Sequence, residues 1–149
     1  GEDVERADLQ FHIQPLSLDR FGEPLHRFPA ITTSVCNLRP ESRGHVTITS
    51  PDPQATPEIA PNYLSAPRDR EIAARAIRLA RRIVATDAFR RFDPQEHLPG
   101  PGVGDDTEEL ARAAVDIGTS IFHPVGTAKM GLASDPAAVV DERGIFEFG

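Results

Sequence analysis

Proline most limits what this chain can fold into, because fourteen prolines are spread over 149 residues. Each proline fixes its own φ angle, lacks a backbone N–H group and disfavours a helix at the residue before it. The distribution predicts short regular elements joined by long connections, and a piece of a larger protein would show the same pattern. The length suits one domain with its own hydrophobic core.

Three segments near the N-terminus have the character of β-strands. Residues 9–13 alternate apolar and polar side chains, residues 30–38 are rich in β-branched residues, and residues 45–50 follow after a short break. Because the break between the second and third segments is short, we expect these two strands to pair antiparallel. Residues 51–64, which are bounded by prolines, are expected to form an extended loop.

A longer segment then changes to helical spacing. Apolar residues recur at three- and four-residue steps between Ile72 and Val84, the stripe of an amphipathic helix. We predict that this helix begins near residues 66–68 and ends by Phe92, before Pro94. Several arginines largely fall off the apolar stripe, and we interpret them as a solvated basic face. They are Arg75, Arg78, Arg81 and Arg82.

A second, shorter helix is predicted after Asp106, which forms the pattern of a capping box with Glu109 three residues later. Its apolar residues are Leu110, Ala114, Ile117 and Ile121. The predicted segments together indicate an α+β fold, in which helices pack against an antiparallel sheet. We expect a single domain over residues 1–149.

Composition argues against several classes of function. The net charge of -7 is unlike that of a nucleic-acid-binding surface, and no stretch approaches the roughly 20 apolar residues of a membrane-spanning helix. Cys36 is the only cysteine, which excludes an intrachain disulfide and a cysteine zinc cluster, and the cytoplasm is the expected location. The glycines of residues 100–104 lack the strand and the Lys-Ser/Thr of a phosphate loop, so we interpret them as a surface connection.

The segment SIFHPVGTAKMG, residues 120–131, contains the residue pattern that points most clearly to catalysis. Pro124 fixes its own φ angle and favours an extended backbone at His123, whereas Gly126 permits conformations closed to other residues. A histidine held in this way can accept or donate protons near neutral pH. On spacing alone, a structural or merely solvated histidine is the more common alternative.

Two other kinds of site are disfavoured around His123. A hydrolase that used Ser120 and Asp141 with this histidine would lack the Gly-x-Ser-x-Gly turn that exposes a nucleophile. No second histidine lies at ligand spacing from His123, so no metal site is expected.

Several stretches, taken together and in order, resemble the C-terminal part of the glucose–methanol–choline (GMC) oxidoreductase family, nearest its choline and alcohol dehydrogenase branch. They are CNLRPESRG at 36–44, DP at 52–53, PEIAPNYLS at 57–65, HPVGTAKMG at 123–131 and AVVD at 138–141. One stretch alone would be weak, but this order with helices between them is specific. The resemblance extends from about Leu9 to Asp141.

The resemblance implies an enzyme that holds FAD on a Rossmann-like domain and oxidises an alcohol by passing a hydride to the flavin. The active-site histidine of the family falls on His123, whose implied role is to accept the proton of the substrate hydroxyl. If the approach to His123 is extended, Ile121 lies on the same side and is the expected substrate-binding residue. A core isoleucine that closes the helix is an equal alternative for Ile121.

Other residues near these motifs match no catalytic position of the family. We interpret the remaining histidines as surface or strand residues; they are His12, His26, His45 and His97. Arg39 and Arg43 flank a turn, and we expect structural pairing with Glu41 or with a carbonyl group.

The chain also departs from the family pattern. The dinucleotide fingerprint Gly-x-Gly-x-x-Gly is absent, and the tail at residues 143–149 does not match the segment that carries a second His or Asn beside the flavin. We therefore expect an isolated substrate domain that neither binds FAD tightly nor oxidises alcohols alone. The FAD-binding domain is the expected partner. Copies of this chain are also expected to self-associate through the exposed face where that domain would dock. A non-catalytic module that binds a small molecule or a protein is the alternative.

Overall fold

The structure is a computed structural model that describes residues 5–146, so residues 147–149 of the divergent tail lie outside it. The chain divides into two compact units. The first unit contains the residues up to Arg43 together with Asn62–Ile117, and the second contains Gly44–Pro61 together with the residues from Gly118 onward. Organisation as a single domain over residues 1–149 stays a prediction.

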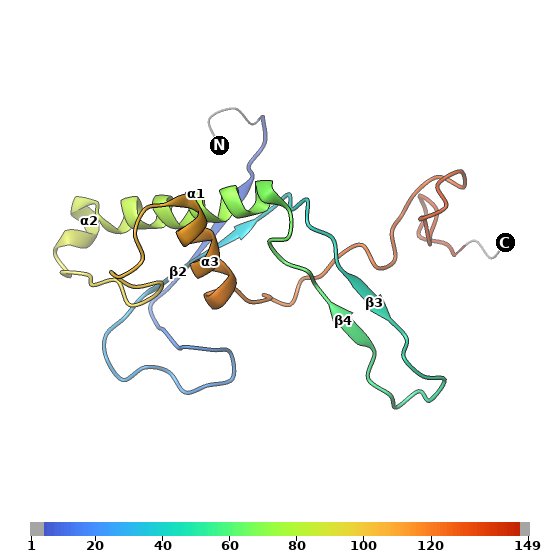
Figure 1. Cartoon of the computed structure of the whole chain (residues 1–149), viewed down its shortest axis with the longest axis horizontal. Coiled ribbons are helices and arrows are strands. Elements are labelled where there is room, and N and C mark those ends of the chain that lie inside the picture. The colour runs from blue at the N-terminus through green and yellow to red at the C-terminus, as the bar shows by residue number, and fades with distance from the viewer. Residues whose placement is uncertain (1–4, 147–149) are drawn as a thin grey trace. The chain divides into compact units, whose positions relative to one another are not determined.

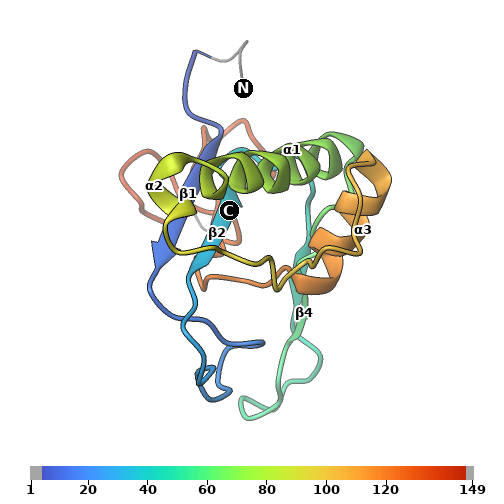
Figure 2. The ribbon, with the colours of Figure 1, turned by 90° about the vertical axis from the view of Figure 1, so that its left-hand side faces the viewer.

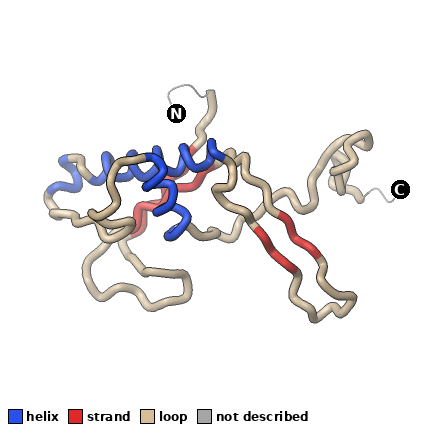
Figure 3. The backbone as a smooth tube through the Cα atoms, in the orientation of Figure 1, coloured by secondary structure: helices blue, strands red, loops and turns tan. Residues whose placement is uncertain are grey.

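Apart from the 18-residue helix α1, the regular elements are short, as the prolines predict, and loops occupy much of the chain between them (Figure 3). In chain order they are β1 (Leu9–Gln14), β2 (Thr32–Asn37), β3 (His45–Thr47), β4 (Glu58–Ala60), α1 (Pro67–Val84), α2 (Asp87–Arg90) and α3 (Thr107–Ile117), labelled in Figure 1. Within residues 5–146, none of the helices has the length and apolar character needed to cross a membrane.

The sheet of the first unit is the antiparallel pair β1 and β2. Their register runs from Leu9 opposite Asn37 to Gln14 opposite Thr32. Thr32 fastens the end of this pair, because its hydroxyl donates a hydrogen bond of 2.7 Å to the carbonyl oxygen of Leu16. Both strands were predicted from alternation and β-branched composition, and both predictions are confirmed.

Helix α1 is the centre of the first unit, because it packs against both β2 and α3. Figure 2 shows α1 lying across the strand pair with α3 beside it. The buried apolar residues of the described chain all come from the two helices and are mostly small, which allows a close approach. They are Ala74, Ala76, Leu110, Ala111 and Ala113.

The starts of both helices are confirmed. Helix α1 begins with Pro67 in its first turn, where the missing N–H costs no helical hydrogen bond. Asp106 precedes α3, and its Oδ1 accepts hydrogen bonds of 3.0 Å from the backbone N–H groups of Glu108 and Glu109. This side chain satisfies two of the free N–H groups at the helix start, as predicted for an N-cap.

The ends of both helices differ from the prediction. The expected single helix to Phe92 is interrupted after α1, where the Thr86 hydroxyl donates a hydrogen bond of 2.8 Å to the Ile83 carbonyl oxygen and α2 starts anew. The second helix was expected to include Ile121, but α3 ends at Ile117. Gly118 comes next, and glycine is a poor helix former that favours helix ends.

The predicted pairing of the second and third strands is wrong. Strand β2 pairs with β1. Strand β3 instead pairs antiparallel with β4, in a register from His45 opposite Ala60 to Thr47 opposite Glu58. The sequence interpretation placed β4 in a loop, because prolines closely flank its three residues. The pairing needs a glycine at position 44, since a Cβ atom there would lie 2.1 Å from the Ala60 carbonyl oxygen.

Candidate functional site

The segment around His123 lies in the second unit and has no helix or strand. The imidazole of His123 is exposed. Phe122, directly before it, has a φ angle of 65°, and Gly126, shortly after it, has a φ angle of 98°. A left-handed conformation is uncommon for an aromatic residue and costs about 1–3 kcal/mol. The backbone is therefore strained next to the histidine that the sequence singled out.

The same conformation bears on Ile121. The prediction that Ile121 and His123 lie on one side required an extended approach, and the backbone is not extended at Phe122. Ile121 is half-buried and follows α3. Its role in binding a substrate stays a prediction, without the support of strand alternation.

The residues after His123 fold back into a hydrogen-bonded loop. Lys129 accepts a hydrogen bond of 2.8 Å at its carbonyl oxygen from the Val139 N–H, and Gly131 donates one of 3.0 Å to the Val140 carbonyl oxygen. The Lys129 ammonium lies 2.5 Å from a carboxylate oxygen of Asp135, and this hydrogen bond, helped by the Ala137 N–H, lowers the pKa of Asp135. The loop fixes the chain on the C-terminal side of the His123 segment.

Asp69, in the first turn of α1, is a buried carboxylate that the sequence analysis missed. It is 1% exposed and accepts hydrogen bonds from the Asn37 amide at 3.1 Å, the Glu41 N–H at 3.0 Å and the Ser42 N–H at 2.7 Å. The Ser42 hydroxyl adds a fourth, at 2.5 Å. This carboxylate holds the turn between β2 and β3 in place.

The protonation of Asp69 follows from the same contacts. Burial alone would raise the pKa of this carboxyl, but the hydrogen bonds from Ser42, Glu41 and Asn37 outweigh burial and lower the pKa below its ordinary value. Arg43, in the same turn, donates hydrogen bonds to the carbonyl oxygens of Pro40 at 2.7 Å and Ser42 at 3.0 Å. The predicted structural pairing of Arg43 with a carbonyl group is confirmed.

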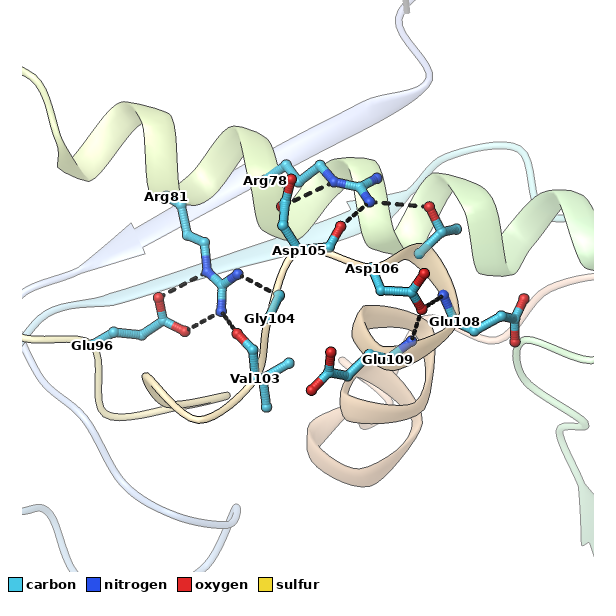
Figure 4. Close-up of polar contacts among 10 residues, drawn as sticks. Arg78, Arg81, Glu96, Val103, Gly104, Asp105, Asp106, Glu108 and Glu109 are labelled. Atoms are coloured by element: carbon cyan, nitrogen blue, oxygen red, sulfur yellow. Dashed lines mark hydrogen bonds and ion pairs between the residues drawn. The ribbon is translucent and has the colours of Figure 1, made fainter.

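The interpretation of the arginines as a solvated basic face is wrong for Arg78 and Arg81. Figure 4 shows Arg81 reaching from α1 to the glycine-rich connection and Arg78 reaching Asp105, directly after it. Arg81 holds Glu96 through two hydrogen bonds of 2.8 and 2.9 Å, and Arg78 contacts Asp105 at 3.1 Å. The hydrogen bond with Glu96 raises the pKa of Arg81 despite the opposing effect of burial.

The glycine-rich connection is filled by these contacts. Arg81 donates to the carbonyl oxygens of Val103 at 2.9 Å and Gly104 at 3.0 Å (Figure 4). A phosphate loop instead directs backbone N–H groups at its anion. These glycines therefore do not fit the phosphates of a dinucleotide, in agreement with their interpretation as a connection.

The remaining histidines divide into two groups. His12 lies in β1, and His45 lies in β3, where its ring is 3.4 Å from Glu58. His26 and His97 come from different loops of the first unit and both approach the carboxylate of Asp19. Sequence spacing gave no sign of this second group, because its members are far apart along the chain.

Comparisons with known proteins agree with the resemblance. A family model described as GMC oxidoreductase matches residues 40–146. Alcohol dehydrogenase (acceptor) of Pseudomonas putida is 38% identical over 92% of this chain and 24% of that protein. An oxygen-dependent choline dehydrogenase of Chromohalobacter salexigens is 36% identical over 96% of this chain and 25% of that protein.

A solved structure extends this similarity to the fold. The crystal structure of pyridoxine 4-oxidase from Mesorbium loti superposes with a TM-score of 0.70 at 30% identity, covering 86% of this chain and 24% of that one. The chain thus spans about a quarter of the length of the relatives it matches. The predicted α+β class, with antiparallel strands and helices, is confirmed. On the family match over residues 40–146, the chain belongs to the GMC oxidoreductase family, in its C-terminal region.

Proposed function

We propose that this chain supplies the substrate-side portion, including the proton-accepting histidine, of an FAD-dependent dehydrogenase that oxidises the CH–OH group of an alcohol, as in choline-type enzymes. The observation that carries the proposal is the exposed imidazole of His123, held between the left-handed Phe122 and Pro124 inside the segment that the family model matches. The GMC oxidoreductase family is flavin-dependent.

His123 has the properties of a base for this reaction. An alcohol that becomes a carbonyl compound loses a hydride from carbon and a proton from its hydroxyl group. A neutral imidazole accepts such a proton near neutral pH, provided that a ring nitrogen reaches the hydroxyl oxygen. Bound FAD supplies the acceptor for the hydride. Ile121, two residues before the histidine, is proposed as a residue that contacts the substrate.

The same proposal assigns FAD binding to a part of the enzyme beyond these residues. In the glycine-rich connection at residues 100–104, the carbonyl oxygens of Val103 and Gly104 accept hydrogen bonds from Arg81, and the sequence lacks the strand and the Lys-Ser/Thr of a phosphate loop. We therefore propose that the chain alone neither binds FAD tightly nor oxidises alcohols, and that a flavin-binding domain is its partner. No cofactor contact is assigned to a residue of this chain.

The test uses a chimera in which this chain replaces the matching quarter of the Pseudomonas putida alcohol dehydrogenase. Anaerobic mixing with an alcohol should bleach the flavin absorption. His123→Asn should slow this reduction by about 10²- to 10⁴-fold, the typical contribution of a general base. His45→Gln, a histidine exchange outside the site, should leave the rate unchanged.

Two controls separate catalysis from folding. The flavin content of each variant shows whether the chimera is intact, and the chain alone mixed with FAD should show no bound flavin band. An unchanged reduction rate in His123→Asn, at full flavin content, would exclude the proton-accepting role and favour a non-catalytic binding module. A tightly bound flavin on the chain alone would contradict the assignment of FAD binding to another part.

A further inference from the structure

Asp19, His26 and His97 form a cluster of three metal-ligating side chains in the first unit, whereas the His123 segment belongs to the second. Asp19 and His26 lie in the connection between β1 and β2, and His97 lies in the connection between α2 and α3. One ligand atom from each of the three residues lies within 4.8 Å of the other two. The cluster therefore joins loops that are more than 70 residues apart along the chain.

The two distances from Asp19 to the histidines fit the edges of a metal coordination tetrahedron, and the third edge, between the histidines, is no longer than 4.8 Å. The Asp19 Oδ1 atom lies 3.2 Å from the Nε2 atom of His26 and 3.5 Å from the Nε2 atom of His97. Zinc bonds to imidazole nitrogen and carboxylate oxygen are about 2.1 Å long, so two ligand atoms on a tetrahedral ion are about 3.4 Å apart. An ion could enter without a large movement of either loop.

The surroundings of His26 support a ligand role. Its Nδ1 atom lies 2.8 Å from the Ser17 hydroxyl, which can accept the Nδ1 proton and leave the Nε2 lone pair directed at the cluster. The Phe28 ring stacks on His26 at 4.6 Å and meets His97 edge-on at 5.6 Å. Metal-bound imidazoles characteristically have such a polar partner on the second nitrogen. The Phe28 ring restricts the movement of both imidazoles.

Both loops are anchored close to the cluster. The His26 N–H donates a hydrogen bond of 2.9 Å to the Ser17 carbonyl oxygen, which closes the first loop on itself. Glu96, next to His97, is held by the two hydrogen bonds from Arg81. The side chain of His26 is 15% exposed, whereas Asp19 and His97 are 58% and 55% exposed, so one side of the cluster is open to water.

We propose that Asp19, His26 and His97 bind one divalent transition-metal ion of the zinc class, with water at the fourth position. Two neutral imidazoles and one carboxylate are a common ligand set for this class of ion. The bound ion would tie the two loops of the first unit together.

This proposal departs from the sequence-based expectation of no metal site. That expectation rested on the spacing around His123, whereas these ligands are brought together by the fold. The competing arrangement has no ion, and both Nε2–H groups donate hydrogen bonds to the Asp19 carboxylate. The two arrangements differ in whether the Nε2 atoms carry protons or a metal.

The experiment titrates the full chain, free of any histidine tag, with zinc chloride in a calorimeter and with Co²⁺ in a visible spectrometer. We expect one ion per chain and the intense visible bands of tetrahedral Co²⁺. Asp19→Asn and His97→Gln should each weaken binding by about tenfold or more, since even the loss of a supporting contact costs about 10- to 100-fold. Both positions are exposed, and circular dichroism checks that each variant is folded.

His45→Gln is the matched control, because it removes a histidine that lies near a carboxylate, Glu58, outside the cluster. It should bind zinc as the unmodified chain does. Three results would overturn the proposal: no stoichiometric zinc binding by the unmodified chain, unchanged affinity in both Asp19→Asn and His97→Gln, or an equal loss in His45→Gln. The first result would leave the cluster as an ion-pair and hydrogen-bond network only.

Discussion

The two units differ in whether they contain a core of buried residues. Within residues 5–146, every buried residue belongs to the first unit, including Asp69 and Leu110. The described residues of the second unit include none, and some of its large apolar side chains are strongly exposed, with Val125 at 92% and Ile48 at 85%. The first unit is thus held by its own packing, whereas the second is held mainly by short hydrogen-bonded turns and one hairpin.

This difference shows where the proposed catalytic residue sits. His123 belongs to the unit without a core of its own, next to the exposed Phe122. Exposed apolar side chains in a cluster are typical of surfaces that contact another part of a protein. The relatives are about four times longer than this chain, so they have further residues that could cover such a surface. The proposed flavin-binding partner is consistent with this contrast.

The largest effect expected from the contrast concerns apolar packing. Leu110 is fully buried between the helices of the first unit, so Leu110→Ala should lower the free energy of unfolding by about 2–5 kcal/mol through lost burial and a cavity. Val125→Ala, in the second unit, should change it by no more than about 0.5 kcal/mol. Urea unfolding followed by the helical circular dichroism signal measures both. Equal losses would mean that Val125 belongs to a core that the chain makes for itself.

A smaller effect is expected from the buried carboxylate of the first unit. Asp69→Asn keeps the shape but places an amide where backbone donors expect a carboxylate, and should cost about 2 kcal/mol of unfolding free energy. Asp105→Asn, which weakens an exposed pair with Arg78, should cost less. The same urea series compares them. A loss in Asp69→Asn no larger than in Asp105→Asn would show that the carboxylate does not organise the turn.

The pH dependence of the stability tests whether the effect of Asp69 comes from its charge. Its pKa in the folded chain is lower than in the unfolded chain, so folding is favoured when the carboxyl is ionised. The stabilisation is fully present above the unfolded pKa of about 3.9 and is lost as the pH falls through the lower folded pKa. The difference in stability between the unmodified chain and Asp69→Asn should therefore shrink below about pH 4. A constant difference down to strongly acidic pH would argue for a packing effect instead of a charge effect.

Local signals explain what the sequence predicted. Strands β1 and β2 and the starts of α1 and α3 depend on alternation, β-branched residues, Pro67 and the Asp106 cap, all of which act within a few residues. The His123 segment was also visible as a conformationally restricted stretch, because a proline and glycines surround one histidine, but the catalytic role of His123 stays a prediction. The left-handed Phe122 was not, since aromatic residues rarely adopt that conformation.

Contacts between distant segments explain what the sequence did not predict. Asp69 lies 27 to 32 residues from its partners, so no local pattern marked this carboxylate. Strand β4 gained its identity from pairing with β3, not from its own three residues. The cluster of Asp19, His26 and His97 depends on two loops that are more than 70 residues apart along the chain. In each case the structure depends on contacts with a distant segment, which the local sequence pattern does not reveal.

The smallest expected effect tests whether side-chain contacts within the first unit also hold its loops in place. Arg81→Lys keeps the charge but loses the paired hydrogen bonds to Glu96, and lysine cannot reach the Val103 and Gly104 carbonyl oxygens in the same planar geometry. We expect a loss of about 1 kcal/mol and faster hydrogen exchange in the glycine-rich connection. Arg75→Lys, on an exposed i,i+4 pair with Glu71, should change stability by only a few tenths of a kcal/mol. If both variants exchange alike, the connection is held by its backbone alone, and the contrast between the units is confined to the packing of α1 with α3 and β2.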